Sequence, residues 1–437
     1  MTQHKISYEN TVTDLLRPIY PNRSFKRWMA FLIICLTVSI VAYYFQLRDG
    51  LGVTGLKDYV SWGMYIANFV FFVATSLVGM LISAVLGLSG VKWATPLTRI
   101  AEIIALAFAM VAGLVIIVDM GRPERLLNVF IYGRVQSPIL WDVTVVSVYV
   151  VISALLLYIP LIPDLKICAE RLEKAPAILK KVYNILSLGW IGSEEQVKIL
   201  RSCIRILSIL IIPVALSIHT VTSWLFAATL RSGWDSTILG PYFVTGAFVA
   251  GCAAVNIAMY FYRNNYNLKE YITDFHFDKM GKLLVLVSLV YLYFNINEFL
   301  VPAYKMKTAD AIHLHALFTG RYAVMFWGTQ ILGLIVPIIL LLFKKMRTPG
   351  FLLTISIFVL VGAWLKRYLI VVPTMEHPFL PIQNVPEEFK FYTPTIIEGI
   401  ITFGTIILAL LIITVLSKLF PVIPIWETTQ KHEEIED

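Results

Sequence analysis

Charged residues are scarce in this chain, and that shortage excludes an ordinary soluble protein. Only 15% of the 437 residues are charged, 58% are hydrophobic, and the mean hydropathy is +0.77, whereas soluble domains carry about 25% charged residues. A helix of roughly 20 apolar residues crosses the hydrocarbon core of a bilayer. Ten such runs lie at residues 28–47, 60–88, 96–119, 139–162, 202–230, 240–262, 281–303, 321–343, 349–372 and 394–420. The sequence therefore predicts an all-α polytopic integral membrane protein with about ten transmembrane helices.

Cysteine and histidine are also scarce, and their positions argue against several redox cofactors. The four cysteines are scattered and form no Cys-x-x-Cys pair, so we expect no Cys-ligated Fe–S cluster in this chain. Of the seven histidines, only His219 lies well inside a predicted span, while His313 and His315 fall in a predicted outer loop. Membrane di-haem cytochromes take pairs of axial histidines from their spans, so we expect no haem either.

Basic residues are distributed unevenly between the predicted loops, which predicts the orientation of the chain. An excess of Lys and Arg marks cytoplasmic loops. Of the 36 Lys and Arg, 24 lie in the termini and in the loops on the same side as the termini. We expect a multi-pass protein of the cytoplasmic membrane with both termini in the cytoplasm. We assign the net charge of +8 to contact with lipid headgroups, and expect no nucleic-acid partner.

The extramembrane segments are short, so we expect a single membrane domain, 28–420, built as two packed four-helix bundles plus two peripheral helices. A cytoplasmic arm (1–27) precedes it and a cytoplasmic acidic tail (421–437) follows, whose end is expected to be solvated. The cytoplasmic loop at about 163–200 has the pattern of amphipathic helices on the membrane surface. The outer loop 373–393 is rich in proline and predicts an extended cap. The tail acids are Glu433, Glu434, Glu436 and Asp437.

Three ionisable residues fall inside or at the end of apolar spans on the predicted outer side. They are Asp119, Asp142 and His219, from three different spans. A charge in a bilayer costs several kcal/mol, so an intramembrane ionisable group is a functional-site candidate by default. Thr222 and Ser223 follow His219 at i+3 and i+4, so they share its helical face.

Structural roles are open for the same residues. Asp119 and Arg122, at i and i+3, could form an interfacial ion pair beside Trp141 as a headgroup anchor, and an isolated histidine such as His219 is often only a packed core residue. The matching depth of Asp142 and His219 favours a functional site.

Quinol oxidation is a chemistry that this set could perform. It needs a base for each departing proton, and a histidine with a carboxylate supplies bases near neutral pH. Aromatic and polar neighbours suit a quinone ring with an isoprenoid tail. We predict Asp119, His219 and Asp142 as catalytic residues. The predicted quinone-binding residues are Tyr65, Arg122, Trp141, Thr220, Ser223, Trp224 and Tyr242.

Further carboxyl groups within spans define a candidate proton path. Glu102 lies in the inner half of its span, and Glu298 and Glu398 lie towards the outer side. Buried carboxyl groups can relay protons. They can equally be neutral, hydrogen-bonded struts between helices, and the residues alone leave both roles open. No metal ligands are predicted.

Several stretches of the chain resemble the NrfD/PsrC family, the membrane subunits of polysulfide-reductase-like complexes. The resemblance extends from about residue 60 onward and is most specific from His219 to the Tyr-Phe-Val run. Within the family, the chain is most similar to the ten-span branch that contains DsrP, QrcD, HybB and ActC. Val78 and Leu225 depart from the ActC pattern, so a DsrP-like chain is favoured. The stretches are Asp119-Met-Gly-Arg-Pro, Ser137-Pro-Ile-Leu-Trp-Asp, Ser217-Ile-His-Thr-Val-Thr-Ser-Trp-Leu-Phe-Ala, Gly233-Trp-Asp-Ser-Thr, Pro241-Tyr-Phe-Val and Tyr392-Thr-Pro-Thr-Ile-Ile-Glu.

The resemblance implies a subunit that binds menaquinone or menaquinol and carries no redox cofactor of its own. It also implies an extracytoplasmic ferredoxin-like Fe–S partner subunit, further redox subunits of a quinol-dependent oxidoreductase, and a link to dissimilatory sulfur metabolism. Two rival functions stay open: a proton- or ion-translocating transporter, and a purely structural membrane anchor. Transporters usually show helices broken by Gly or Pro near the midplane, whereas glycines such as Gly79 and Gly251 here have the pattern of close helix packing.

Overall fold

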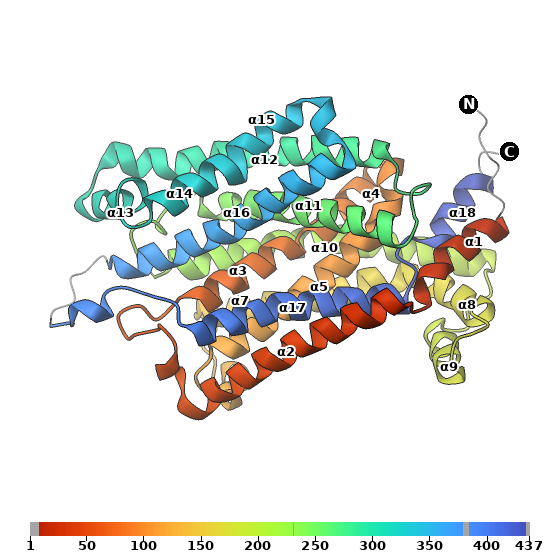
Figure 1. The fold of residues 1–437 in the computed structure, drawn as a ribbon, viewed down its shortest axis with the longest axis horizontal. Helices are drawn as coiled ribbons and strands as arrows, with labels where there is room; N and C mark the ends of the chain where they lie inside the picture. The colour runs from red at the N-terminus through yellow and green to blue at the C-terminus, as the bar shows by residue number, and fades with distance from the viewer. Residues whose placement is uncertain (1–7, 230, 379–383, 434–437) are drawn as a thin grey trace.

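The fold is entirely helical in the residues that the structure describes. A computed structural model describes residues 8–229, 231–378 and 384–433, and no strand occurs in these ranges. Ten helices or helix runs are long and apolar enough to cross a membrane, which confirms the predicted polytopic all-α class. Figure 1 shows them as a bundle of roughly parallel rods with both chain ends at the same end of the molecule.

The candidate spans contain one or more helical segments each, and most extend beyond the apolar runs. They are Tyr8–Asp49, Met64–Leu88, Lys92–Asp119, Pro138–Arg171, Glu194–Ala227, Leu239–Asn265, Asp274–Lys305, Ala323–Leu342, Pro349–Glu376 and Ile396–Leu419. The α-helices are α1 (Tyr8–Leu16), α2 (Arg23–Asp49), α3 (Met64–Ser76), α4 (Leu86–Leu88), α5 (Thr95–Asp119), α6 (Asn128–Ile131), α7 (Pro138–Tyr158), α8 (Ile162–Arg171), α9 (Ala177–Leu186), α10 (Glu194–Ala227), α11 (Leu239–Asn265), α12 (Asp274–Lys305), α13 (Thr308–Phe318), α14 (Ala323–Gln330), α15 (Val336–Leu342), α16 (Pro349–Glu376), α17 (Ile396–Leu419) and α18 (Ile425–Glu433).

Helix α3 lies at the centre of the packing. It contacts α5 and α10, which with α7 form one group of neighbours, and it also contacts α11 and α16. Helices α11, α12, α15 and α16 contact one another as a second group, while α2 packs along α17 (Figure 1). Because α3 and α11 have neighbours on every side, they are among the most buried spans.

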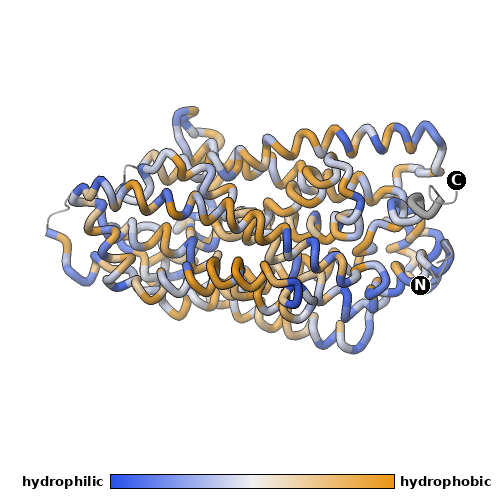
Figure 2. Tube along the Cα trace, turned by 90° about the horizontal axis from the view of Figure 1, so that it is seen from above, coloured by the Kyte–Doolittle hydropathy of each residue, from blue (hydrophilic) through white to orange (hydrophobic). Residues whose placement is uncertain are grey.

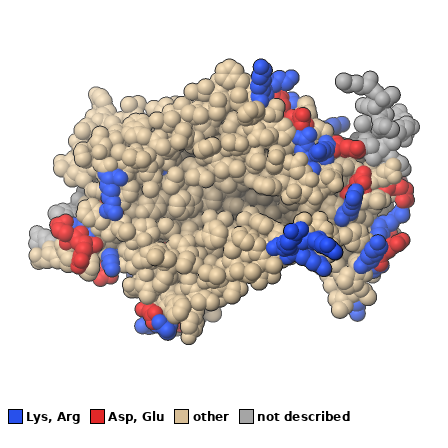
Figure 3. All heavy atoms as spheres, viewed as in Figure 1, with Lys and Arg blue, Asp and Glu red and all other residues tan. Residues whose placement is uncertain are grey.

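The apolar and charged surfaces are separated along the length of the helices. The tube in Figure 2 is mostly hydrophobic through its middle and hydrophilic towards both ends. On the face shown in Figure 3, Lys, Arg, Asp and Glu gather at the two ends and leave an uncharged band between them. A band of this kind matches the hydrocarbon region of a bilayer.

Capping side chains extend several helices beyond their apolar runs. Helix α10 begins eight residues before its predicted apolar run, where the Ser193 side chain accepts a hydrogen bond from the Gln196 backbone N–H. Helix α12 begins with a capping box in which the side chains of Thr273 and His276 bond to each other's backbone. Such caps satisfy backbone groups left free at a helix start, so hydropathy alone places these boundaries too late.

The segments between spans are partly helical. Residues 163–200 contain most of α8, all of α9 and the start of α10, and α9 exposes apolar side chains such as Ile178 and Ile185. His313 and His315 lie between two candidate spans, as predicted, but the connection that carries them is the helix α13. In the proline-rich segment, α16 continues through Pro373 to Glu376, and Pro381 lies outside the described residues.

The C-terminal segment packs into the fold as far as the structure describes its side chains. Arg99 in α5 forms a buried ion pair with Asp164 in α8. The two oxygens of Asp164 accept hydrogen bonds from the backbone N–H groups of Ile425 (3.1 Å) and Trp426 (2.9 Å), at the start of α18. Asp164 therefore caps a helix more than 250 residues away in the chain. The predicted solvated tip, from Glu433 onward, lies outside the described side chains.

Two spans contain a π-helical turn. Met80–Val85 interrupts the span that begins with α3, and Ile331–Ile335 separates α14 from α15. Turns of this type are rare and frequently lie at functional sites. Gly79 and Gly251 pack closely against Ala105 and Val78, as their pattern predicts.

Candidate functional site

A buried histidine on α10 shares a helical face with a threonine that binds a buried carboxylate of α7. The Thr222 hydroxyl donates a hydrogen bond of 2.6 Å to Asp142 Oδ1 on α7, and Asp142 is only 4% exposed. His219, one helical turn before Thr222, is 2% exposed; its Nδ1 lies 3.1 Å from the carbonyl oxygen of Ala215. Its Nε2 is buried without a hydrogen-bond partner. Thr222 thus holds the carboxylate on the helical face of the histidine.

Asp119 belongs to a separate polar group at the end of α5. Its Oδ1 is buried and has no hydrogen-bond partner, and its charge lies within range of the Glu398 carboxylate. Beside it, the Tyr65 hydroxyl donates to Gln46 Oε1 at 2.6 Å, and Gln46 Nε2 donates to the carbonyl oxygen of Val118 at 2.8 Å. No hydrogen bond or ion pair joins Asp119 to Asp142 or His219 in the described part of the chain.

Some predicted quinone-binding residues face away from this buried site. Arg122 is exposed and makes no ion pair with Asp119 among the described residues, so the predicted pairing is wrong. Trp141 and Trp224 are 38% and 52% exposed, because they lie on the outer faces of their helices. Trp141 donates its indole N–H to the carbonyl oxygen of Val135. This placement suits an interfacial anchor, the alternative role considered for Trp141.

Thr220 and Ser223 are bonded within their own helix. The Thr220 hydroxyl donates to the carbonyl oxygen of Leu216 at 2.8 Å, and the Ser223 hydroxyl donates to that of Thr220 at 2.7 Å. Tyr242 is fully buried on α11, where it stacks on Tyr291 with the ring centroids 5.2 Å apart and donates to Asn295 Oδ1 at 3.1 Å.

An aromatic cluster lies next to the His219 face. Phe226, two turns after His219 on α10, packs against Trp62 and Trp234, with ring centroids 5.6 and 4.9 Å away. Phe243 on α11 completes the cluster at 5.8 Å from Phe226. The Trp234 indole donates to the carbonyl oxygen of Ile370 at 2.7 Å, which fixes the loop after α10 against α16.

Two adjacent basic residues near the middle of α16 were not predicted from the sequence. Lys366 and Arg367 are 3% and 2% exposed. The Lys366 ammonium lies 4.4 Å from the Phe299 ring centroid, and the Arg367 guanidinium lies 5.3 Å from that of Phe243. Arg367 Nε and Nη1 are buried without partners, and its charge is within range of His219. The available signal was a Lys-Arg pair inside the apolar run 349–372.

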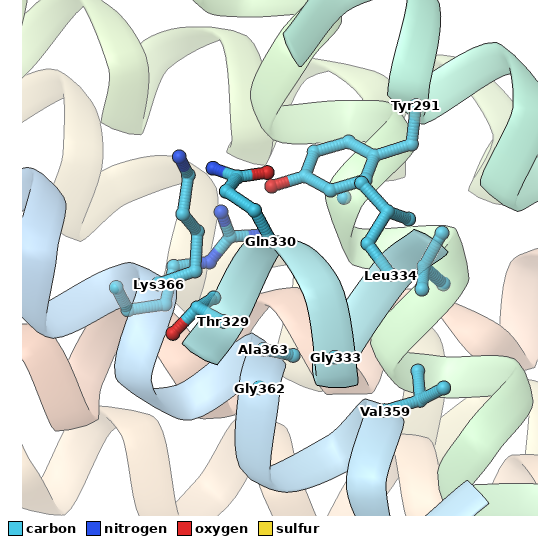
Figure 4. Close-up of a pocket in the computed structure, with 12 residues that line it drawn as sticks. Tyr291, Thr329, Gln330, Gly333, Leu334, Val359, Gly362, Ala363 and Lys366 are labelled. Atoms are coloured by element: carbon cyan, nitrogen blue, oxygen red, sulfur yellow. The ribbon is translucent and has the colours of Figure 1, made fainter. Parts of the chain in front are cut away.

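Small cavities surround this basic pair. One, of about 20 Å³, lies beside Lys366, Gln330, Thr329 and Tyr291 at the π-helical turn (Figure 4). It is large enough for about one water molecule.

A second cavity of the same size lies beside Lys366, Glu298, His313 and Thr374. Glu298 Oε2, His313 Nδ1 and Thr374 Oγ1 are all buried without partners there.

The three carboxyl groups of the candidate proton path have different surroundings. Glu398 is fully buried, and its oxygens accept from the backbone N–H groups of Gly55 (2.7 Å) and Thr395 (2.8 Å) and from the Tyr392 hydroxyl (2.7 Å). These hydrogen bonds tie the start of α17 to the segment around Gly55. Glu102 accepts a hydrogen bond from the Ser83 hydroxyl and lines a larger cavity.

Four cavities are described for the characterised residues, and Asp119, Asp142 and His219 line none of these four. In the same part of the chain, no group of three or more His, Cys, Asp or Glu is placed to hold a metal ion.

The ten candidate spans and the buried residues His219, Thr222 and Asp142 define a multi-pass membrane protein with ionisable side chains inside its helical bundle. Comparison with known families then gives the assignment. The family model of polysulphide reductase NrfD matches residues 52–377, about three quarters of the chain. The protein belongs to the NrfD family.

Relatives of this chain are membrane subunits of several oxidoreductases. A candidate membrane subunit of a dimethyl sulfoxide reductase from Halobacterium salinarum is 27% identical over 74% of this chain and 71% of its own length. A selenate reductase subunit from Mesobacillus selenatarsenatis is 24% identical over 91% of this chain and 94% of its own. An Hdr-like menaquinol oxidoreductase integral membrane subunit of Archaeoglobus fulgidus is 23% identical over 91% and 94%.

Proposed function

We propose that this chain is the quinone-reactive membrane subunit of a multi-subunit respiratory oxidoreductase in the cytoplasmic membrane. It exchanges electrons between menaquinol or menaquinone, in the outer leaflet, and an extracytoplasmic Fe–S partner subunit. The observation that carries this proposal is the buried pair of His219 and Asp142, which Thr222 holds on one helical face. The name of one relative, a menaquinol oxidoreductase subunit, supports the choice of quinone.

The unpartnered atoms of the site fit a quinol. His219 Nε2 and Asp119 Oδ1 are buried without partners, and a buried polar atom without a partner is rare enough to need an explanation such as a missing ligand. Oxidation of a quinol supplies two electrons and two protons. His219 Nε2 is free to accept a proton, since its Nδ1 faces the Ala215 carbonyl oxygen. The Asp142 carboxylate is the base for the second proton, the two electrons pass to the Fe–S partner subunit, and the nearby apolar rings exclude water.

Substitutions in the pair test the proposal. In the purified complex, His219→Gln and Asp142→Asn are expected to slow the reduction of the partner's Fe–S clusters by a menaquinol analogue about a hundredfold or more, the usual scale of lost general-base catalysis. The rate is measured by stopped-flow bleaching of the cluster absorbance. Co-purification of the partner subunits shows whether assembly is intact.

Thr144→Val is the matched control. Thr144 lies two residues after Asp142 on α7, is exposed, and bonds only to the Leu140 carbonyl oxygen of its own helix. Its rate should equal that of the unmodified complex. Wild-type rates in both site variants would contradict the quinone site and support a purely structural membrane anchor.

The surroundings of the carboxyl groups refine the candidate proton path. Glu298 and Glu102 each line a cavity, whereas Glu398 is held by backbone and tyrosine donors. Together with Lys366, the first two are the better supported members of a path. The DsrP-like motif pattern extends the proposal to a complex of dissimilatory sulfur metabolism.

A further inference from the structure

A large cavity opens at the end of the molecule opposite to Asp119. Its volume is about 590 Å³, within the range of small-molecule sites. The ends of α4, α5, α7 and α10 form its walls, and Trp426 of α18 adds to them. Ser208, the cavity-lining residue of α10 that is nearest in sequence to His219, lies 11 residues before it, or about 16 Å at 1.5 Å per residue. The cavity is therefore distinct from the histidine–carboxylate site.

Basic side chains line this cavity on two sides. Arg201 and Arg205 lie one turn apart on α10, and Lys92 comes from the connection before α5. Guanidinium groups bind phosphate oxygens through paired, charge-assisted hydrogen bonds. Basic pockets between transmembrane helices on the cytoplasmic side are known to receive phospholipid headgroups, and the charge bias predicts that side for this end of the chain.

Acidic side chains line the same cavity. Glu427 comes from α18, and Glu102, which is 4% exposed, accepts a hydrogen bond from Ser83 in the π-helical turn. The Glu427 carboxylate disfavours a purely anionic group in this cavity, because like charges repel. A cavity lined by both basic and acidic side chains instead suits a lipid headgroup that carries a positive and a negative charge.

The apolar lining suits the remainder of a lipid. Leu88, Ile204 and Leu156 line the cavity, and Leu88 is 42% exposed. Arg201 lies at the start of the predicted apolar run of span five, at the level where headgroups meet hydrocarbon. Trp426, which also packs on Trp190 with centroids 6.5 Å apart, is the amphipathic aromatic expected at that level.

We propose that this cavity binds the headgroup of a membrane phospholipid that carries a primary ammonium beside its phosphate. Arg201, Arg205 and Lys92 contact the phosphate, and Glu427 and Glu102 contact the ammonium. The acyl chains leave past Leu88 into the bilayer. The bound lipid thereby fills the space between α4, α10 and α18.

Native mass spectrometry of the delipidated full-length chain in detergent tests the site. Added phosphatidylethanolamine should bind with one-to-one stoichiometry, in preference to phosphatidylglycerol. Arg201→Gln with Arg205→Gln should weaken this binding by about tenfold for each lost charge-assisted hydrogen bond. Lys344→Gln with Lys345→Gln is the matched control, since these exposed lysines lie on the same predicted side but outside the cavity, and it should bind as the unmodified chain does.

A second variant fills part of the cavity without removing a charged side chain. A side chain at Gly87, which lines the cavity, would meet no atom within 4 Å, so Gly87→Trp should fold and block the headgroup. Gly350→Trp, in equally open surroundings outside the cavity, should leave binding unchanged. Three results would each overturn the proposal. Phosphatidylglycerol could bind as tightly as phosphatidylethanolamine, or inorganic phosphate alone could displace the lipid. The third result is unchanged lipid binding in the Arg201/Arg205 and Gly87 variants.

Discussion

Gly233 lies in the loop after α10, with a φ of +88°, and a Cβ at this position would be 2.7 Å from His313 Nε2. Both the backbone conformation and the space therefore require glycine. Its neighbour Ser232 donates a hydrogen bond of 2.7 Å to Asp310 on α13. The loop is thus fixed on α13 by side chains that surround the Glu298 cavity.

Gly233→Ala should destabilise the protein by about 1–3 kcal/mol, the usual cost of a strained backbone position. The clash with His313 adds to the strain. Thermal unfolding in detergent, followed by intrinsic fluorescence, measures the loss. Gly350→Ala is the control, because Gly350 has open space and no positive φ, and an equally large loss there would contradict the explanation.

His313, on α13 and outside the candidate spans, should make stability depend on pH. Burial lowers its pKa to about 3, and the nearby positive charges of His377 and Lys366 add to the effect. The unfolded histidine titrates near 6.5, so below that pH the unfolded chain binds more protons than the folded protein. Stability contributed by neutral His313 is therefore present above about pH 6.5 and is lost as the pH falls towards 3.

The melting temperature should accordingly drop between about pH 7 and pH 5, and His313→Gln should show a smaller drop because glutamine does not titrate. His315→Gln, an exposed position on the same helix, should keep the full pH dependence. If the melting temperature of His313→Gln depends on pH as that of the unmodified protein does, other titrating groups cause the dependence.

The relative positions of two residues could be predicted from the sequence where both lie on one helix. The shared face of His219 and Thr222 follows from their positions at i and i+3, and the structure has both buried on it. Asp142 contacts that face from another helix, 80 residues earlier, and only its matching depth indicated this. Arg367 was missed because nothing within the apolar run 349–372 indicates that its charge comes within range of His219 on another helix.

At the level of elements, the sequence predicted all ten spans and the helices within 163–200, but it did not predict the ends of the spans or short helices such as α13 and α18. Caps such as Ser193 and Thr273 extend helices into polar sequence. The placement of α18 depends on Asp164, a residue in α8 that hydropathy groups with a cytoplasmic loop. Contacts between such distant segments leave no periodic signal in the chain.

Asp164→Asn should release the start of α18. Removal of one partner of a buried ion pair costs about 3–5 kcal/mol, and asparagine accepts fewer hydrogen bonds than the carboxylate that now bonds Ile425 and Trp426. Hydrogen–deuterium exchange should rise in residues 421–429 and stay unchanged in α16. Asp49→Asn, in an exposed pair with Arg48, is the control and should leave that segment protected.

At the scale of the whole molecule, the first and last described helices, α1 and α18, lie in contact at one end of the bundle (Figure 1). An even number of spans requires this arrangement. The bias of Lys and Arg further predicts that this end is cytoplasmic.

Reporter fusions test the predicted side. A fluorescent protein that matures only in the cytoplasm should be fluorescent at the C-terminus, and alkaline phosphatase, active only outside, should be inactive there. Fusions after residue 305, in the connection between α12 and α13, should give the opposite pair of results. Reversed signals at both positions would invert the orientation and place His219 towards the cytoplasm.

The cap that Asp164 provides for α18 has a consequence for biosynthesis. Ile425 and Trp426 follow the tenth span, yet they supply two of the donors to a carboxylate already inserted with the fourth span. Until these two residues have been synthesised, Asp164 lacks both donors and the cavity that Arg201 lines lacks its Trp426 wall. Synthesis of α18 is therefore the step that closes this end of the bundle, and chains truncated after span ten should be recognised by membrane proteases as unfinished.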